Sequence, residues 1–147
     1  MKTQTGENFT IVDLGELEAL DQFVFEAPEV KIKREGKVFL KDLLHLTGAE
    51  ISINKLPAHE SIPFYHKHQQ NEEIYIFLKG TGEFQVDGKN FPVGEGSIVR
   101  IDPAGERCLR NCAETQLYYV VIQVKAGSYS GRTIQDGVAV RKRVVWD

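Results

Sequence analysis

The stretch HKHQQNEEIYIFLKG, residues 66–80, places two histidines and a carboxylate ahead of a run of strand-forming residues that ends in glycine. Side chains alternate between the two faces of a strand, so we expect His66 and His68 to point the same way. A short turn at residues 69–71 would bring Glu73, on the next strand, back beside them. Two imidazoles and one carboxylate on one face form a site for a divalent transition metal with open coordination positions.

A second stretch with a recognisable pattern follows: GSIVRIDPAGERCLRN, residues 96–111. In this order and at this separation, the two stretches resemble the two sequence motifs of the cupin superfamily. The first motif reads His-x-His, three or four residues, Glu, six residues and Gly, and the chain matches it up to Gly80. The resemblance covers roughly residues 49–125.

The second motif of that family reads Gly, five residues, Pro-x-Gly, two residues, His, three residues and Asn. The chain has Pro-x-Gly at residues 103–105, but six residues separate Gly96 from Pro103. Counting forward from Pro-x-Gly puts Cys108 at the position of the histidine, and Asn111 then comes one residue early. The first motif therefore matches from His66 to Gly80 but lacks its usual leading Gly, where Glu60 stands, and the second motif is altered.

The resemblance implies an all-β fold, a double-stranded β-helix (jelly-roll) barrel with extra N-terminal strands and a short helix. Residues 1–147 would form a single cupin domain, with the barrel motifs at about 49–125. Residues 1–48 would supply N-terminal strands or an arm, and residues 126–147 a C-terminal extension. Turn signals every 8 to 12 residues between short apolar stretches independently favour a sandwich or barrel.

The local pattern predicts individual elements. Asp87-Gly88 is a favoured type I′ turn, so residues 84–91 should form a hairpin. Pro63 should open a strand that carries the two histidines. Residues 11–20 should form a short helix or a packed arm, and residues 138–146 should pack onto the body or pair across a dimer. The other expected elements are strands at 23–25, 30–33, 37–40, 51–56, 72–79, 97–101 and 116–125, and a helical turn at 42–46 closed by Gly48.

The expected metal ligands are His66, His68 and Glu73, with Cys108 as a further ligand. Cysteine ligates as a thiolate, and a metal lowers the pKa of its thiol; the alternative is that Cys108 is a small buried thiol. The donor set suits Fe, Mn, Ni or Zn. A metal-free site that binds a small molecule directly is the other alternative.

Pocket residues follow from strand parity. Tyr75 and Phe77 share the face of Glu73 and should line the pocket. Arg100 and Gln123 lie on strands that could face the cavity, and an inward Arg100 would anchor a carboxylate or phosphate group. The alternative for these last two residues is an exposed strand face.

These features support two hypotheses about function. In the first, a small stand-alone cupin uses its metal as a dioxygenase, isomerase or decarboxylase on a small molecule. An inward Arg100 would favour an anionic substrate. In the second, a non-catalytic cupin binds or senses a small molecule with a degenerate or absent metal site. Both faces of the strand at 72–79 are apolar, which together with the resemblance predicts a homodimer.

Composition narrows the setting of the protein. The chain of 147 residues has a net charge of -3, which argues against nucleic acid as a partner. The longest apolar run, residues 117–122, is far shorter than the roughly 20 residues of a membrane span. The N-terminal residues lack the apolar core of a signal peptide, so we expect a cytoplasmic protein with reduced cysteines and no membrane partner.

Overall fold

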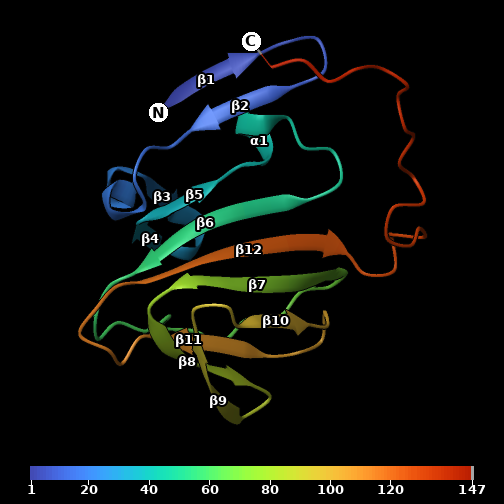
Figure 1. The fold of residues 1–147 in the computed structure, drawn as a ribbon. Coiled ribbons are helices and arrows are strands. Elements are labelled where there is room, and N and C mark those ends of the chain that lie inside the picture. Colours follow the sequence, from blue (N-terminus) through green and yellow to red (C-terminus); the bar gives the residue numbers. More distant parts are fainter. Residues whose placement is uncertain (147) are drawn as a thin grey trace.

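Two antiparallel sheets make up the body of the computed structural model, which describes residues 1–146 (Figure 1). The five-stranded sheet has the order β10 (Ile98–Ile101), β7 (Asn71–Lys79), β12 (Leu117–Lys125), β6 (Glu50–Leu56) and β5 (Lys37–Phe39). The three-stranded sheet has the order β11 (Arg107–Arg110), β8 (Thr81–Val86) and β9 (Lys89–Gly94). This all-β arrangement is the jelly-roll fold that the sequence predicts.

The main core lies between the two sheets. On β7 the buried side chains alternate as predicted, with Glu73, Tyr75 and Phe77 all facing inward. The ring of Phe84, fully buried on β8, contacts Tyr75 edge-on, with 4.8 Å between the ring centroids. The core is formed by Leu56, Tyr75, Phe77, Phe84, Val93, Ile101, Leu109, Leu117, Tyr119 and Val121. These residues come from both sheets, so the core is buried only when the two sheets pack against each other.

The N-terminal segment covers the outer face of the five-stranded sheet. The 3₁₀ helix η1 (Leu17–Gln22) buries Leu20 against Val38 and Tyr118 of that face. The predicted helical turn is α1 (Lys41–Leu44), and it ends at His45 in the left-handed conformation rather than at Gly48. Two hairpins flank this layer: β1 (Lys2–Thr5) with β2 (Thr10–Asp13), and β3 (Val24–Ala27) with β4 (Ile32–Glu35), the latter through the 3₁₀ helix η2 (Pro28–Val30).

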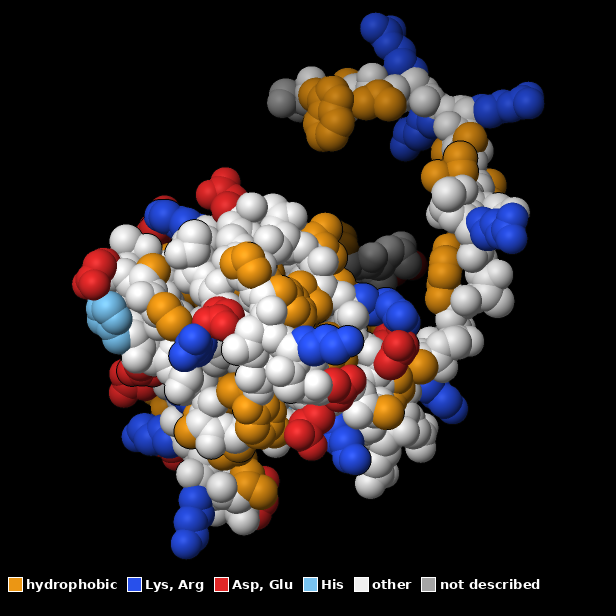
Figure 2. All heavy atoms as spheres, turned by 90° about the horizontal axis from the view of Figure 1, so that it is seen from below, with side chains coloured by type: hydrophobic (Ala, Val, Ile, Leu, Met, Phe, Trp, Pro, Cys, Tyr) orange, Lys and Arg blue, Asp and Glu red, His pale blue; other side chains and the backbone are white. Residues whose placement is uncertain are grey.

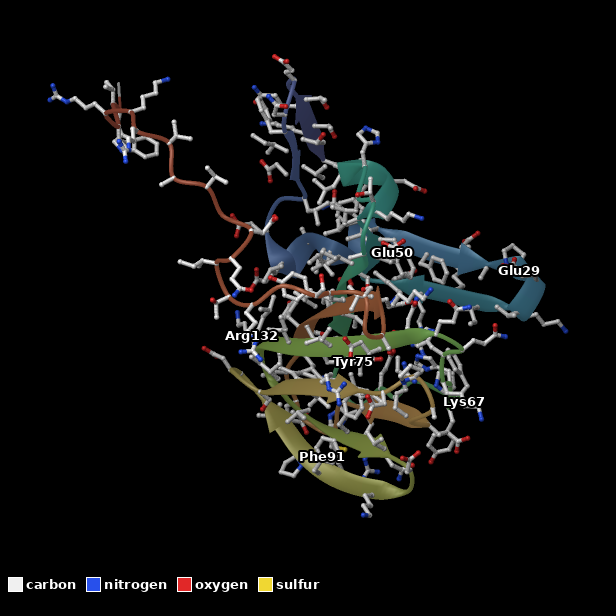
Figure 3. All side chains as sticks on the ribbon, turned by 90° about the vertical axis from the view of Figure 1, so that its right-hand side faces the viewer. Glu29, Glu50, Lys67, Tyr75, Phe91 and Arg132 are labelled. Carbon is white, nitrogen blue, oxygen red and sulfur yellow. The ribbon has the colours of Figure 1, made fainter. Side chains whose placement is uncertain are left out.

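The β3–β4 hairpin stands at one end of the barrel. Figure 3 shows it projecting on the side where Lys67 lies, with Glu29 at its tip. Arg34 of this hairpin donates to the carbonyl oxygen of Ser61 at 3.3 Å and lies 3.7 Å from the carboxylate of Glu60. The hairpin is thereby tied to the segment that leads to the histidines.

The predicted turn at Asp87-Gly88 and the glycine that ends the first motif both have left-handed backbone. Asp87 and Gly88 have φ of 48° and 77°, the left-handed values of a type I′ hairpin. Gly80, which ends the first motif, has φ of 89°, and a Cβ there would lie 2.3 Å from the carbonyl oxygen of Gln116. The motif requires glycine at this position because the backbone of the neighbouring strand leaves no room for a side chain.

The predicted strand at the histidines is wrong, and so is the predicted packing of residues 138–146 onto the body, whereas their pairing across a dimer stays a prediction. Residues 61–70 form no continuous strand; Ser61 and His66 make only isolated bridges to β11. Residues 126–146 also contain no strand and do not pack onto the body: they extend away from it (Figure 2), and Trp146 is 91% exposed. Within the described residues, no helix has the length and apolar character needed to cross a membrane.

Candidate metal centre

Two imidazoles and one carboxylate converge on the inner wall of the barrel. The ligand atoms of His66, His68 and Glu73 all lie within 4.8 Å of one another. His68 Nε2 is 3.0 Å from Glu73 Oε1, and His66 Nε2 is 3.6 Å from Glu73 Oε2. Two ligands of one ion, each at about 2.0–2.2 Å, are separated by about 3–4 Å, so these distances match those around a shared cation.

Backbone contacts with β11 hold the histidines in this arrangement. The amide and carbonyl of His66 exchange hydrogen bonds with those of Arg107, at 3.3 and 3.1 Å, and the amide of His68 donates to Pro103 at 3.0 Å. The segment therefore runs extended along β11, although it is not a regular strand. An extended backbone keeps the alternation of side chains, so His66 and His68 point the same way as predicted.

Arg107 is the main partner of Glu73, and the sequence analysis did not identify it. Its side chain is fully buried, and its Nε and Nη2 atoms donate to Glu73 Oε2 at 3.0 and 2.7 Å. A third donor to the same oxygen is the hydroxyl of Tyr75, at 2.9 Å. The remaining guanidinium nitrogen, Nη1, donates to the carbonyl oxygen of Gly105 at 2.7 Å.

These contacts decide the charge of the carboxyl group. Burial alone would raise the pKa of Glu73, but hydrogen bonds from His66 and Arg107, with the guanidinium charge, hold that pKa well below its usual range. Burial and the Glu73 charge raise the pKa of Tyr75, so its hydroxyl keeps its proton and donates. Glu73 is therefore an ionised carboxylate, in which Oε2 accepts hydrogen bonds from Arg107 and Oε1 lies near His68.

Two ring nitrogens at the centre lack a hydrogen-bond partner. His66 Nδ1 and His68 Nε2 are both buried and unsatisfied, and the contact of His68 Nε2 with Glu73 does not have hydrogen-bond geometry. Buried polar atoms are rarely left without a partner. A cation between His68 Nε2 and the carboxylate would satisfy this nitrogen, so the residues fit a metal ion.

The centre opens into a cavity of about 610 Å³ between the sheets and the β3–β4 hairpin. Tyr75 and Gln123 line it, as predicted, and Figure 3 shows Tyr75 pointing between the sheets. Phe77 does not reach it, because its ring packs deeper, against Phe84 and Tyr119. Its walls also carry polar side chains that the sequence analysis did not select: Arg34, Lys37, Ser52 and Asn54.

The prediction of an inward Arg100 was wrong. In the pairing of β10 with β7, Ile101 lies opposite Glu73 and Arg100 lies opposite Ile74, on the outer face. The Arg100 side chain is 56% exposed and pairs at 2.8 Å with both Glu72 and Asp102. It is therefore a surface residue and cannot contact a ligand in the cavity.

Comparison with known proteins identifies the family. The family model described as a cupin domain matches residues 53–123. A solved cupin protein from Bacteroides fragilis is 44% identical, with a TM-score of 0.69, over 75% of this chain and 93% of that chain. The chain belongs to the cupin superfamily.

Another relative is the oxalate-binding protein of Thermotoga maritima, 29% identical over 56% of this cupin and 67% of that protein. A solved structure from the same organism, titled a predicted oxalate decarboxylase, is 28% identical with a TM-score of 0.56, over 65% of this cupin and 83% of that chain.

The structure also resolves the altered second motif of this cupin. Asn111 is buried, and its amide bridges three carbonyls, those of Leu56, Pro57 and Thr115, at 2.8–3.1 Å. Three residues separate it from Arg107, which is the spacing from Asn to His in the motif. Arg107, rather than Cys108, therefore occupies the position of the third histidine. Counting back from Asn111 would have found it in the sequence.

Cys108 lines the cavity but lies outside the converging group. On β11 the side chains alternate, and it is Arg107 that turns toward Glu73. The Cys108 thiol instead lies 3.0 Å from the carbonyl oxygen of Ile62. In the part of the chain that the structure describes, the candidate metal ligands are thus the two histidines and the carboxylate of the first motif.

Proposed function

We propose that this cupin binds a divalent transition metal (Fe, Mn, Ni or Zn) through His66, His68 and Glu73 and uses it on a small carboxylic acid. The observation that carries the proposal is the convergence of two imidazoles and an ionised carboxylate, with an unsatisfied buried nitrogen at His68 Nε2, on the wall of a cavity. When bound, the ion would supply Lewis acidity toward a substrate oxygen. The oxalate-related relatives support a small carboxylic acid as substrate.

The remaining residues of the centre would orient Glu73 and keep the site apolar. Arg107 and Tyr75 hold the carboxylate ionised and fixed in orientation, as partners of metal ligands commonly do. The aromatic walls keep the site largely apolar, which strengthens electrostatic interactions there. Decarboxylation and isomerisation both need an enolate or carbanion to be stabilised in such an environment.

Metal content is the first test. Untagged wild-type protein and the double variant His66→Ala/His68→Ala would be analysed by plasma mass spectrometry, with His45→Ala/His59→Ala as a matched control. The control removes the other two histidines of the chain, one of which pairs with Glu114 on the surface. We expect near-stoichiometric metal in the wild type and the control, and none in the first double variant. Absence of metal from wild-type protein after reconstitution with all four ions would refute the proposal.

A specific observation favours a second candidate, a metal-free binding protein. Arg107 already neutralises Glu73, and its fixed positive charge would repel a cation held by the same carboxylate. A small-molecule binder or sensor would need no ion. Turnover separates the candidates: an enzyme loses oxalate decarboxylation in His66→Ala while its thermal melting is unchanged, whereas a binder shows no turnover in either protein.

We also propose a homodimer. The outer face of the β7–β10 edge carries Ile74, Ile76 and Ile98, of which Ile98 is 68% exposed. An apolar edge of this kind is suited to an isologous interface. Light scattering at micromolar concentration should give twice the mass of the chain, and a monomeric mass would refute the proposal.

A further inference from the structure

Lys37 presents an amine inside the cavity without a carboxylate to neutralise it. Lys33, Lys55 and Lys79 each pair with an acidic side chain. Within residues 1–146, Lys37 makes no such pair: its Nζ donates to Asn54 Oδ1 at 2.9 Å and to Ser52 Oγ at 3.5 Å, and lies 4.7 Å from the centre of the Phe39 ring. A cation withdrawn from water is normally paired, and a ligand anion in the cavity would supply such a partner.

The strand register places this amine on the same inner face as the metal centre. Lys37 lies opposite Asn54, and Asn54 lies opposite Tyr119 on β12. Glu73 lies opposite Gln123, four residues further along β12, or about 13 Å along the strand. The two ends are also three strand spacings of about 4.8 Å apart across the sheet. The two backbone positions are therefore well separated, and both side chains extend into the cavity that lies between them.

Six aromatic rings contribute to the lining of the cavity. The rings that line the cavity belong to Phe25, Phe39, Phe64, Tyr75, Phe84 and Tyr119. A volume of about 610 Å³ is in the range of pockets that hold drug-sized molecules. This wall favours an apolar or aromatic body between two polar ends.

The electrostatics of Lys37 agree with an anion-binding role. The pKa of Lys37 is lowered to about 8, mainly by burial; the charge of Arg34 contributes to this shift, while those of Glu73 and Glu50 oppose it. The amine is still mostly protonated at neutral pH. A carboxylate placed at Nζ would stabilise the charged form and recover the free energy lost by burial.

We propose that Lys37 binds the carboxylate of a small amphipathic acid whose apolar body lies along the aromatic wall and whose far end reaches His66, His68 and Glu73. The reach to the metal centre rests on the proposed function, whereas the anion contact at Lys37 does not. The substrate class is then an acid with an apolar body, and the role of Lys37 is to orient that acid.

The test uses metal-free, chelator-treated protein and two probes of equal shape, 3-phenylpropanoate and its neutral amide 3-phenylpropanamide. Binding would be measured by isothermal titration calorimetry. We expect the acid to bind at least about tenfold more tightly than the amide, as a charge-assisted hydrogen bond in a pocket requires. Lys37→Met should abolish this preference, and Lys37→Arg should keep it. Lys89→Met is the matched control, because Lys89 is an exposed residue of the β8–β9 hairpin.

Circular dichroism would show whether each variant is folded. If Lys37→Met does not fold, the comparison of wild type with Lys37→Arg still tests the assignment. Equal affinity for acid and amide, no binding of either probe, or an unchanged preference in Lys37→Met would each overturn the assignment. The His66→Ala/His68→Ala protein should keep the preference for the acid. An acid preference in a protein that takes up no metal would refute the metal centre and leave the role of Lys37 intact.

Discussion

Replacing Lys37 with methionine should change how the stability of the protein depends on pH. The pKa of Lys37 falls from 10.5 to about 8 on folding because burial disfavours the charged amine. Between these values the unfolded chain binds more protons than the folded chain, so wild-type stability rises as the pH rises. Each unit of difference in pKa between the unfolded and the folded chain corresponds to about 1.36 kcal/mol. The charge on Lys37 therefore lowers the free energy of unfolding by about 3 kcal/mol at pH 7 and by about 1 kcal/mol at pH 10.

Methionine has a similar length and no charge, so the variant lacks this dependence. Urea unfolding of wild type, Lys37→Met and Lys89→Met would be followed by circular dichroism at pH 7 and pH 10. We expect the free energy of unfolding of Lys37→Met, relative to wild type, to fall by about 2 kcal/mol between the two pH values. Loss of the contact with Asn54 shifts both values alike and cancels. A difference that is the same at both pH values would refute the reasoning, as would a similar change in Lys89→Met.

Three further substitutions test the centre and the fold. Arg107→His removes the cation beside Glu73 and adds an imidazole, so zinc affinity, measured by competition with a chelator, should rise at least about tenfold; an unchanged affinity would mean that residue 107 does not face the ion. Phe84→Ala should lower the free energy of unfolding by about 3–5 kcal/mol in urea titration, because the ring is fully buried; a loss under about 1 kcal/mol would contradict its place in the core. Gly80→Ala should greatly reduce the yield of folded protein, since its methyl group would meet Gln116 O at 2.3 Å, and a wild-type melting temperature would disprove that close approach.

The sequence was sufficient for the fold and the first motif because both depend on local patterns. Alternation along β7 predicts which side chains face inward, and Asp87-Gly88 predicts its hairpin from the backbone of two residues. His66 and His68 converge on Glu73 even though they lie on no regular strand. Extended backbone alone is enough for side chains two residues apart to point the same way.

The residues that were missed depend on strand parity and on contacts between distant segments. β10 reads Ile-Val-Arg-Ile, so apolar residues occupy both faces and the sequence does not say that Arg100 faces outward. Lys37 lies on a strand of three residues, and its place in the cavity is set by pairing with β6. In the second motif, counting forward from Pro-x-Gly selects Cys108, whereas counting back from Asn111 selects Arg107. The buried amide of Asn111 shows that the second count is the right one.

The pairing of Arg107 with Glu73 also bears on how such a centre changes in evolution. Two of the arginine codons become histidine codons by a single base substitution. The backbone of residue 107 is held by hydrogen bonds to His66 that do not involve the guanidinium group, although that group also donates to the carbonyl oxygen of Gly105. The third imidazole can therefore be gained or lost by a point mutation without rearrangement of the barrel. Related genes should include both forms, with the same fold and different chemistry at the centre.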